Sequence, residues 1–369
     1  MAEKHVYRFG VDENGVDVTE KAGATPDEAK WITGGKGCNL AEMASIGLPV
    51  PPGFTIDCPT CVWYSTHNNT WPEGILDTIA EYEADLEKRM GKKLGDANDP
   101  LLVSVRSGAP FSMPGMMDTV LNLGLNDTSV QGLIKQTGNE RFAWDSYRRF
   151  VSMFSDVVMG VDKQLFEDAL NEKKAAKGVK LDTELDADDL KDLVRIFKEI
   201  FCANVDGKKY PEVLKDGKVA FPDDPYLQLR LAEQAVFGSW MNDRAMVYRA
   251  ANKIPDDLGT AVNVQTMVFG NKGATSATGV AFTRNPADGT NERYGDFLIN
   301  AQGEDVVAGI RNTQPIAELV KVPELKEAGE QLFHVFEVLE DHYHDMMDIE
   351  FTIEQGKLWM LQTRASSYT

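Results

Sequence analysis

The chain has 369 residues, 43% of them hydrophobic, a length that suits two or three structural units better than one compact domain. Its 38 Lys and Arg residues oppose 58 Asp and Glu, a formal net charge of -20, which argues against nucleic acid and anionic membranes as partners. No run approaches the roughly 20 apolar residues of a membrane span, and the N-terminus has no apolar signal core. We therefore expect a cytoplasmic protein.

The cysteine pattern indicates neither a disulfide framework nor a metal site. Four cysteines are too few to staple a chain of this length. Cys58 and Cys61 form a CxxC pair, which invites a redox or zinc interpretation. A zinc site would need a second ligand pair, and the sequence around the CxxC offers a single histidine, His67, and no such pair. We therefore expect both thiols to be structural.

A glycine-rich segment and a helix start mark the first fifty residues. The segment "NLAEMASIG" predicts a short helix capped by Asn39 and ending at Gly47. Overlapping its start, "TGGKGCN" places Lys36 between glycines, where the backbone N–H groups of a helix start attract anions. The spacing of a Walker A loop is absent, so this motif alone is a weak indication of phosphate binding.

A second cation and a flexible loop follow. Arg106 comes directly after "LLVSV", a predicted buried strand, and ligand clefts commonly open at strand ends. A lone arginine there is more often structural. Residues 112–119, "SMPGMMDT", then place a Pro-Gly pair among three methionines. Together with the Lys36 segment and an acidic hairpin at the C-terminus, these are the parts of a nucleoside triphosphate site.

The middle of the chain is predicted to be helical and the last third to be rich in strands. Helical periodicity extends over residues 127–253, and from Gly259 onward "AVNVQTMVF", "GVAFT", "FLIN", "DIEFTI" and "KLWMLQT" predict strands. One amphipathic helix interrupts these strands. Its apolar stripe comprises Leu325, Leu332, Phe336, Leu339 and Tyr343. This order predicts an α+β protein with two sheet-bearing lobes and a helical insertion.

The terminal segment "DIEFTIEQGKLWMLQTR" predicts a hairpin whose loop length decides which side chains share a face. A two-residue loop of Gln355 and Gly356 would pair Glu350 with Leu361 and mix charge into the apolar side. A three-residue loop, residues 354–356, pairs Ile353 with Lys357 instead. Burial of five large apolar side chains, about 1.5 to 3 kcal/mol each, leads us to predict the three-residue loop.

This register predicts one apolar and one polar face of the hairpin. The apolar face comprises Ile349, Phe351, Ile353, Trp359 and Leu361. The polar face comprises Asp348, Glu350, Thr352, Gln362 and Arg364. Carboxylates about 6 to 7 Å apart along a strand can hold hard cations that are also bound to phosphate oxygens, and an arginine can bind phosphate with two hydrogen bonds. An ordinary solvent-exposed face with ion pairs is the alternative.

Six segments together resemble a known family over nearly the whole chain and in the same order. They are "GGKGCNLAEM", "LLVSVRSGAPFSMPGMMDTVLNLGLND", "TAVNVQTMVFGN", "GVAFTRNP", "INAQGEDVVAGIR" and "EFTIEQGKLWMLQTR". The chain is similar to the N-terminal nucleotide-binding region of the pyruvate, phosphate dikinase family.

The resemblance implies an ATP-grasp-like fold with a helical subdomain. The first ATP-binding lobe would comprise residues 1–125 plus about 226–258, the helical subdomain residues 126–225, and the second lobe residues 259–369. The family's swivelling phosphohistidine domain and its C-terminal barrel would lie outside the chain, which ends at Thr369. We therefore expect a fragment of a longer enzyme that is a homo-oligomer at full length.

The resemblance also implies roles for residues of the first two thirds of the chain. Lys36 and Arg106 match phosphate-contacting cations. Gly115, Met116 and Thr119 belong to the loop that closes on the triphosphate, with Gly115 letting the backbone approach phosphate. The hinge that presents backbone groups to adenine matches Met267 and Val268, and a buried strand edge is the alternative for both.

Further roles follow from the same resemblance for the last third and for one helix. Asp348, Glu350 and Gln362 match residues near Mg²⁺ and the phosphates, and Arg364 matches a phosphate-binding arginine. Two other assignments are a basic position near the phosphates for Arg149 and a ribose or cleft-lining role for Glu304. The catalytic set implied by the family is therefore Lys36, Arg106, Arg149 and Arg364.

The family reaction converts ATP, phosphate and pyruvate into AMP, pyrophosphate and phosphoenolpyruvate through a phosphohistidine on the swivelling domain. The resemblance thus implies a phosphotransferase fragment that binds Mg-ATP and phosphate but does not complete the reaction alone. The alternatives are the similar ATP domain of phosphoenolpyruvate synthase, an ATP-grasp ligase, and a non-catalytic nucleotide-binding or docking module. The "SMPGMMDT" loop favours the dikinase over the synthase.

Overall fold

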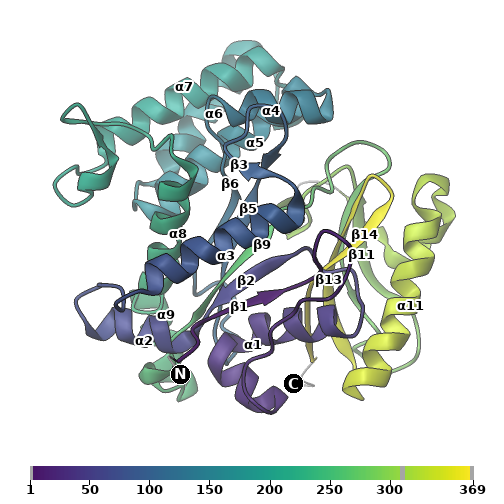
Figure 1. Ribbon diagram of the computed structural model, residues 1–369. Helices are drawn as coiled ribbons and strands as arrows, with labels where there is room; N and C mark the ends of the chain where they lie inside the picture. Colours follow the sequence, from purple (N-terminus) through teal and green to yellow (C-terminus); the bar gives the residue numbers. More distant parts are fainter. Residues whose placement is uncertain (1–2, 308–311, 366–369) are drawn as a thin grey trace. The chain divides into compact units, whose positions relative to one another are not determined.

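The computed structural model describes residues 3–307 and 312–365 and shows a mixed α/β protein (Figure 1). The chain divides into two compact units. Unit 1 comprises Met1–Cys58, Gly108–Ser112 and Val268–Thr369, and unit 2 comprises Pro59–Ser107 and Met113–Met267. Neither unit is continuous in sequence. In the described part, no helix is both long and apolar enough to span a membrane.

Unit 1 contains an antiparallel pair of strands, β1 and β2, and a five-stranded sheet in the order β12-β11-β10-β13-β14. The strands are β1 Val6–Phe9, β2 Gly53–Ile56, β10 Ala277–Phe282, β11 Tyr294–Ile299, β12 Gln314–Pro315, β13 Met347–Glu354 and β14 Lys357–Ala365. The helices are α1 Pro26–Ser45, α10 Gly303–Val307 and α11 Lys326–Tyr343. The four strand pairings of the five-stranded sheet described by the structure are antiparallel.

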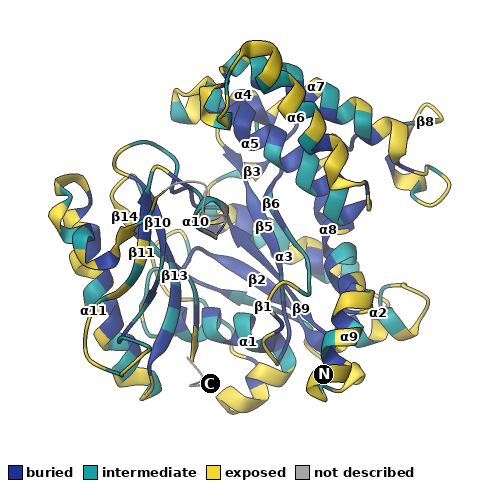
Figure 2. Cartoon of the chain, turned by 180° about the vertical axis from the view of Figure 1, so that it is seen from behind, coloured by how far each residue is buried: buried dark blue, intermediate teal, exposed yellow. Residues whose placement is uncertain are grey.

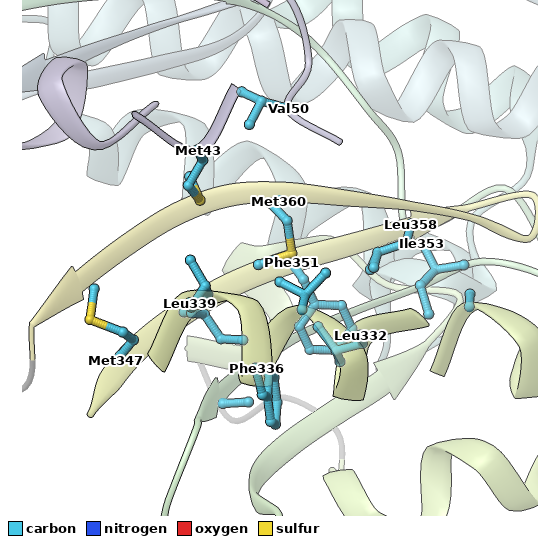
Figure 3. Close-up of a cluster of buried hydrophobic side chains, with 14 of the residues drawn as sticks. Met43, Val50, Leu332, Phe336, Leu339, Met347, Phe351, Ile353, Leu358 and Met360 are labelled. Atoms are coloured by element: carbon cyan, nitrogen blue, oxygen red, sulfur yellow. The ribbon is translucent and has the colours of Figure 1, made fainter. Parts of the chain in front are cut away.

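The core of unit 1 lies between α11 and one face of this sheet (Figure 1). Leu332, Phe336 and Leu339 of α11 are buried, as the apolar stripe predicted. Figure 3 shows them gathered with buried side chains of β13 and β14 in one cluster. The same cluster includes Met43 and Val50 from the first fifty residues. The N-terminal and C-terminal parts of the chain therefore share a hydrophobic core.

Unit 2 contains strands β9, β5 and β6 in that order and most of the helices. Its strands are β3 Lys93–Leu94, β4 Pro100–Leu101, β5 Val103–Gly108, β6 Thr119–Leu123, β7 Leu214–Lys215, β8 Lys218–Val219 and β9 Ala261–Thr266. Its helices are α2 Cys58–Thr66, α3 Ile75–Met90, α4 Ser129–Thr137, α5 Glu140–Met153, α6 Lys163–Lys177, α7 Ala187–Asn204, α8 Pro225–Ser239 and α9 Asp243–Asn252. Every residue of β9 is buried, and the strand is dark blue in Figure 2.

Helix α5 is the centre of the helical part of unit 2. Ala143, Tyr147, Phe150 and Val151 are fully buried at the spacing of one helical face, and the helix packs against α4, α7 and β6. The predicted helical character of residues 127–253 is therefore confirmed for the helices α4 to α9. The two compact units have other boundaries than the predicted domains. Residues 1–58 belong to the same unit as the C-terminal strands.

The helix predicted to begin at Asn39 begins much earlier. Helix α1 starts at Pro26 after Thr25, whose hydroxyl accepts a hydrogen bond from the N–H of Glu28. Asn39 is not a cap, and its side-chain amide donates to the carbonyl oxygen of Thr363 at 2.8 Å instead. Gly34 interrupts α1 with a φ of 70°, so Lys36 still lies just after a helical restart. The glycine-rich segment, predicted to lie at the start of a helix, therefore lies inside α1.

The predicted register of the terminal hairpin is wrong. Glu354 pairs with Lys357 across a two-residue turn, in which Gln355 and Gly356 both have positive φ, 48° and 82°, as a type I′ turn requires. A β-bulge between Glu350 and Phe351 then shifts the ladder by one residue, so that Leu361 is the extra residue. Buried Leu358 and Met360 occupy the core face in place of the predicted Trp359 and Leu361, which are half-buried.

Cys58 and Cys61 are buried in α2 and are not joined in a disulfide. The Sγ of Cys61 lies 3.8 Å from the carbonyl oxygen of Phe237 on α8. Burial without a disulfide agrees with the structural role predicted for the pair.

Candidate functional site

The outer face of the β13–β14 hairpin gathers the polar residues predicted from its sequence. Glu350 lies directly opposite Gln362, and Asp348 lies directly opposite Arg364. The Nε of Arg364 donates to Oδ2 of Asp348 at 2.5 Å, with 48% of the arginine side chain and 15% of the aspartate exposed. Since opposite residues of an antiparallel pair point to the same face, all four side chains share one side of the sheet.

The bulge at Leu361 is the reason for this arrangement. A two-residue turn without a bulge would pair Glu350 with Leu361 and turn Gln362 toward the core. Because Leu361 is an extra residue, Gln362 and Arg364 return to the polar face of the sheet, while Leu358 and Met360 stay buried in the core. Bulges are common next to functional sites because they re-aim side chains. The polar set was predicted correctly, although the register used to predict it was wrong.

The same sheet face continues onto β10 and is partly covered by α10. Val280 pairs with Glu350, and Thr278 pairs with Thr352. Helix α10 packs against β10, and a Cβ on Gly303 would lie 4.0 Å from the Thr278 hydroxyl. Glu304 is the next residue of α10 after Gly303, so its backbone lies close to this face of the sheet. The side chain of Glu304 lies outside the described residues.

Lys36 is positioned by the break in α1. At Gly34, a Cβ would lie only 1.6 Å from the carbonyl oxygen of Gly108, so only glycine permits this approach. The N–H of Gly35 donates to the carbonyl oxygen of Ala109 at 3.0 Å. These contacts fix the segment that carries Lys36 against residues 108–109 of unit 1. The side chain of Lys36 is half-buried.

Val268 begins a segment that is tied to the hairpin turn. The N–H of the next residue, Phe269, donates to Oε2 of Glu354 at 2.7 Å. The Nζ of Lys272 lies 3.2 Å from the same carboxylate oxygen. Glu354 therefore anchors the backbone of this segment at Phe269, and Val268, which precedes Phe269, is buried.

In unit 2, Arg106 lies opposite Thr119 in the β5–β6 ladder. Arg106 is 9% exposed, and its Nη2 donates to Oε1 of Gln265, which is itself buried on β9. The side-chain amide of Asn263 donates to the backbone carbonyl of Arg106 at 3.5 Å. Two amide side chains of β9 thus hold the arginine in place. The β5–β6 ladder places Arg106 opposite Thr119, another residue predicted for the nucleotide site.

The "SMPGMMDT" loop forms a tight turn. The N–H of Met116 donates to the carbonyl oxygen of Met113 at 3.1 Å, and Gly115 has a φ of 71°. Proline followed by glycine at the two central positions is the signature of a type II turn. Met113 is buried, whereas Pro114 and Gly115 are exposed.

Arg149 lies on α5 in a buried charge cluster. Its Nε donates to Oδ2 of Asp145 at 3.0 Å, and Arg148 bonds the other oxygen of that carboxylate. Burial raises the pKa of Asp145, but the two guanidinium groups outweigh it and bring the pKa down to about 2. Asp145 therefore stays ionised and orients Arg149, which is 25% exposed.

The chain matches the family model described as "Pyruvate phosphate dikinase, AMP/ATP-binding domain" over residues 65–325 and 317–369. It is 54% identical to pyruvate, phosphate dikinase of Clostridium symbiosum over 92% of the chain and 37% of that protein. It is 51% identical to the Rhizobium meliloti protein of the same name over 99% of the chain and 40% of that protein. It is 54% identical to the chloroplastic pyruvate, phosphate dikinase of Mesembryanthemum crystallinum over 92% of the chain and 34% of that protein.

The chain belongs to the pyruvate phosphate dikinase AMP/ATP-binding domain family. This confirms the resemblance inferred from the six sequence segments. The chain spans only about two fifths, or less, of the length of these relatives.

The boundaries between the units of this dikinase-family domain fall beside several predicted nucleotide residues. The chain passes between units after Cys58, after Ser107, after Ser112 and after Met267. Arg106 and the predicted hinge residues Met267 and Val268 lie within two residues of these points. The N–H of Met267 donates to the carbonyl oxygen of Leu102 at 2.9 Å within unit 2.

Sequence reasoning missed the amides that support Arg106 in this dikinase-family domain. Asn263 and Gln265 alternate with valines in "AVNVQT", and both are at most 1% exposed. Buried side-chain amides require hydrogen-bond partners, so polar residues at every second position of an apolar strand were a usable signal. Such a pattern indicates buried amide side chains that bond a polar or charged residue of the neighbouring strand, here Arg106.

Proposed function

We propose that this chain binds Mg-ATP and phosphate and transfers the β-phosphoryl group of ATP to a histidine on a separate domain. The overall reaction is ATP + phosphate + pyruvate = AMP + pyrophosphate + phosphoenolpyruvate. The observation that carries the proposal is the polar hairpin face, with Glu350 opposite Gln362 and Asp348 opposite Arg364, in a chain of an AMP/ATP-binding family.

The donor chemistry of the hairpin fits a magnesium ion bound to phosphate. Glu350 and Gln362 offer a carboxylate and an amide oxygen at opposite ladder positions, and Asp348 is held by Arg364. Mg²⁺ prefers oxygen ligands and is usually held by one or two carboxylates together with substrate phosphates. Bound there, it would supply charge neutralisation to the phosphate oxygens.

The protein's own cations would bind and orient the phosphate chain. Phosphoryl transfer depends chiefly on positioning and on electrostatic stabilisation of equatorial oxygens. Arg106 is held rigidly by Gln265, and Lys36 follows a helical restart whose N–H groups favour anions. Arg364 and Arg149 would add charge, each oriented by a carboxylate.

The remaining assignments support an ATP-grasp-like organisation with residues 126–225 as the inserted helical subdomain. Gly115, Met116 and Thr119 would cover the triphosphate, and Met267 and Val268 would present backbone groups to adenine. Glu304 would line the ribose. Cytoplasmic location and homo-oligomerisation of the full-length enzyme also stay predictions. The dikinase names of the relatives favour this reaction over that of phosphoenolpyruvate synthase.

Titration calorimetry with ATP, with and without Mg²⁺, tests the binding step. We expect heat of binding that depends on Mg²⁺, and we expect Glu350→Gln to weaken Mg-ATP binding at least about tenfold because it removes one charge from the metal ligands. Glu318→Gln is the matched control, since Glu318 is 44% exposed and pairs with Lys321, three residues away on the surface. Equal affinities of wild type and Glu350→Gln would contradict the metal assignment.

Transfer is tested by adding a phosphohistidine domain from a full-length relative and ATP labelled at the β-phosphate. Labelled phosphohistidine is the expected product. Binding of Mg-ATP without any labelled histidine would favour a non-catalytic nucleotide-binding module. Absence of Mg-ATP binding would overturn every nucleotide interpretation.

A further inference from the structure

The turn between α8 and α9 holds the "SMPGMMDT" loop through side chains that neither the sequence motifs nor the family description assigned. Arg244, in the first turn of α9, donates from Nε to the carbonyl oxygen of Met116 at 3.1 Å. Its Nη2 bonds Oδ1 of Asp118. The guanidinium of Arg244 thus bonds both the backbone carbonyl of Met116 and the carboxylate of Asp118.

Two further residues of the same turn, Asn242 and Ser239, form hydrogen bonds with the loop. Asn242 caps α9 by accepting a hydrogen bond from the N–H of Ala245, and its amide N donates to the carbonyl oxygen of Met116 at 3.3 Å. The hydroxyl of Ser239 accepts from the N–H of Asp118 at 3.4 Å. The cap therefore fixes the orientation of Asn242 as a donor to the loop.

The charges around Arg244 favour the bound position of its side chain. Burial raises the pKa of Asp118, and Arg244 acts against this rise. Asp156 also lies near enough to interact electrostatically with both Asp118 and Arg244. The Arg244 guanidinium, whose side chain is 55% exposed, thus bonds the partly buried Asp118 and is also attracted by Asp156.

We infer that Arg244 is a positioning residue for the triphosphate-binding loop, which it holds in an ordered conformation before nucleotide binds. The inference rests on the proposed function. Arg244 lies outside the loop and would act through its bonds to Met116 and Asp118, not through contact with the nucleotide.

A loop that is ordered before nucleotide binds loses less conformational entropy on binding. Fixing the backbone of a residue costs conformational entropy, and the loop contains an exposed Pro-Gly turn with little packing of its own. The contacts from Arg244 fix Met116 and Asp118 directly before Thr119, which pairs with Arg106. Nucleotide binding then has less disorder to remove, which increases affinity.

The test compares ATP with AMP, which lacks the β- and γ-phosphates. In Arg244→Ala, we expect the dissociation constant for Mg-ATP to rise about tenfold, equivalent to about 1.4 kcal/mol, and that for AMP to stay within about twofold. Arg244→Lys should lie between Ala and wild type, because lysine can restore the ion pair with Asp118 but not the two-pronged grip. Hydrogen exchange at the Met116 and Asp118 amides should accelerate in nucleotide-free Arg244→Ala.

Arg195→Ala is the matched control. Arg195 is 59% exposed and pairs with Asp192 and Glu199 on α7, away from the loop in sequence and element. It should change neither affinity nor loop exchange. Unchanged loop exchange and ATP affinity in Arg244→Ala, or an equal loss for ATP and AMP, would overturn the inference while leaving the proposed function standing. Failure of the wild type to bind Mg-ATP would overturn both.

Discussion

Glu233 on α8 is a buried acid outside the proposed site. It is 1% exposed, and its Oε1 has no hydrogen-bond partner among the described residues. Burial raises its pKa well above the usual range, the nearby Glu83 raises it further, and Arg230 opposes the rise. Burial likewise raises the pKa of Glu83 to about 7. Both acids therefore bind protons more tightly in the folded chain than in the unfolded chain.

This raised affinity for protons predicts that stability falls as pH rises. Below the unfolded-state pKa of about 4.3, both states are protonated and the acids contribute no pH dependence. Between that value and the folded-state pKa, each acid lowers the free energy of unfolding by up to about 1.4 kcal/mol per pH unit. For Glu83 the window is about pH 4 to 7.

Replacing Glu233 by Gln should therefore stabilise the protein at pH 8 and leave its stability at pH 4 nearly unchanged. We expect a gain of about 1 to 3 kcal/mol at pH 8, because a neutral amide avoids burying a charge. Urea unfolding of both proteins at the two pH values measures the effect. Glu199→Gln, at a 64% exposed position, is the control, and a parallel shift of both variants would contradict the assignment to burial.

At the scale of elements, the terminal hairpin shows how a local pattern and an irregularity combine. Alternation in "DIEFTI" was enough to place Ile349, Phe351 and Ile353 in the core and Asp348 and Glu350 on the other face. Alternation in "KLWMLQT" is broken at Leu361, because a bulge adds a residue that no period of two contains. The sequence therefore predicted one strand correctly and the partner's register incorrectly.

The bulge predicts an asymmetry between deletion and insertion. Deletion of Leu361 should be tolerated within about 1 kcal/mol, because Phe351 still faces Met360 and Glu350 still faces Gln362. Insertion of one alanine after Leu361 should instead weaken Mg-ATP binding at least about tenfold. A regular strand would then place Leu361 outward and the alanine inward, so that Gln362 keeps its face but moves from opposite Glu350 to opposite Asp348. Thermal unfolding and Mg-ATP affinity measure both variants. A tolerated insertion and a disruptive deletion would contradict the bulge assignment.

At the scale of the whole molecule, each unit is assembled from separate segments. The core of unit 1 joins Leu40, Met43 and Val50 to side chains of α11 and the C-terminal strands. Unit 2 lies within residues 59–107 and 113–267. The first 58 residues consequently depend on strands that follow more than two hundred residues later.

Truncation after residue 267 should therefore damage the beginning of the chain more than its middle. We expect α5 and α7 to keep hydrogen-exchange protection, since their packing lies in unit 2, and α1 to lose it because Met43 and Val50 lose their partners. Binding of a hydrophobic dye should increase. Retained protection across α1 in the truncated chain would show that the shared core is dispensable.

The sequence by itself determined what short-range patterns encode. The apolar stripe of α11, the helical stretch around α5, the polar face of β13 and the family follow from periodicity and motif order, because burial of one face selects the element type. Tertiary structure alone decided the continuation of α1 through Gly34, the bulge at Leu361 and the support of Arg106 by Gln265. Each depends on a contact between segments distant in sequence, such as Gly34 with Gly108, and local propensity carries no information about such approaches.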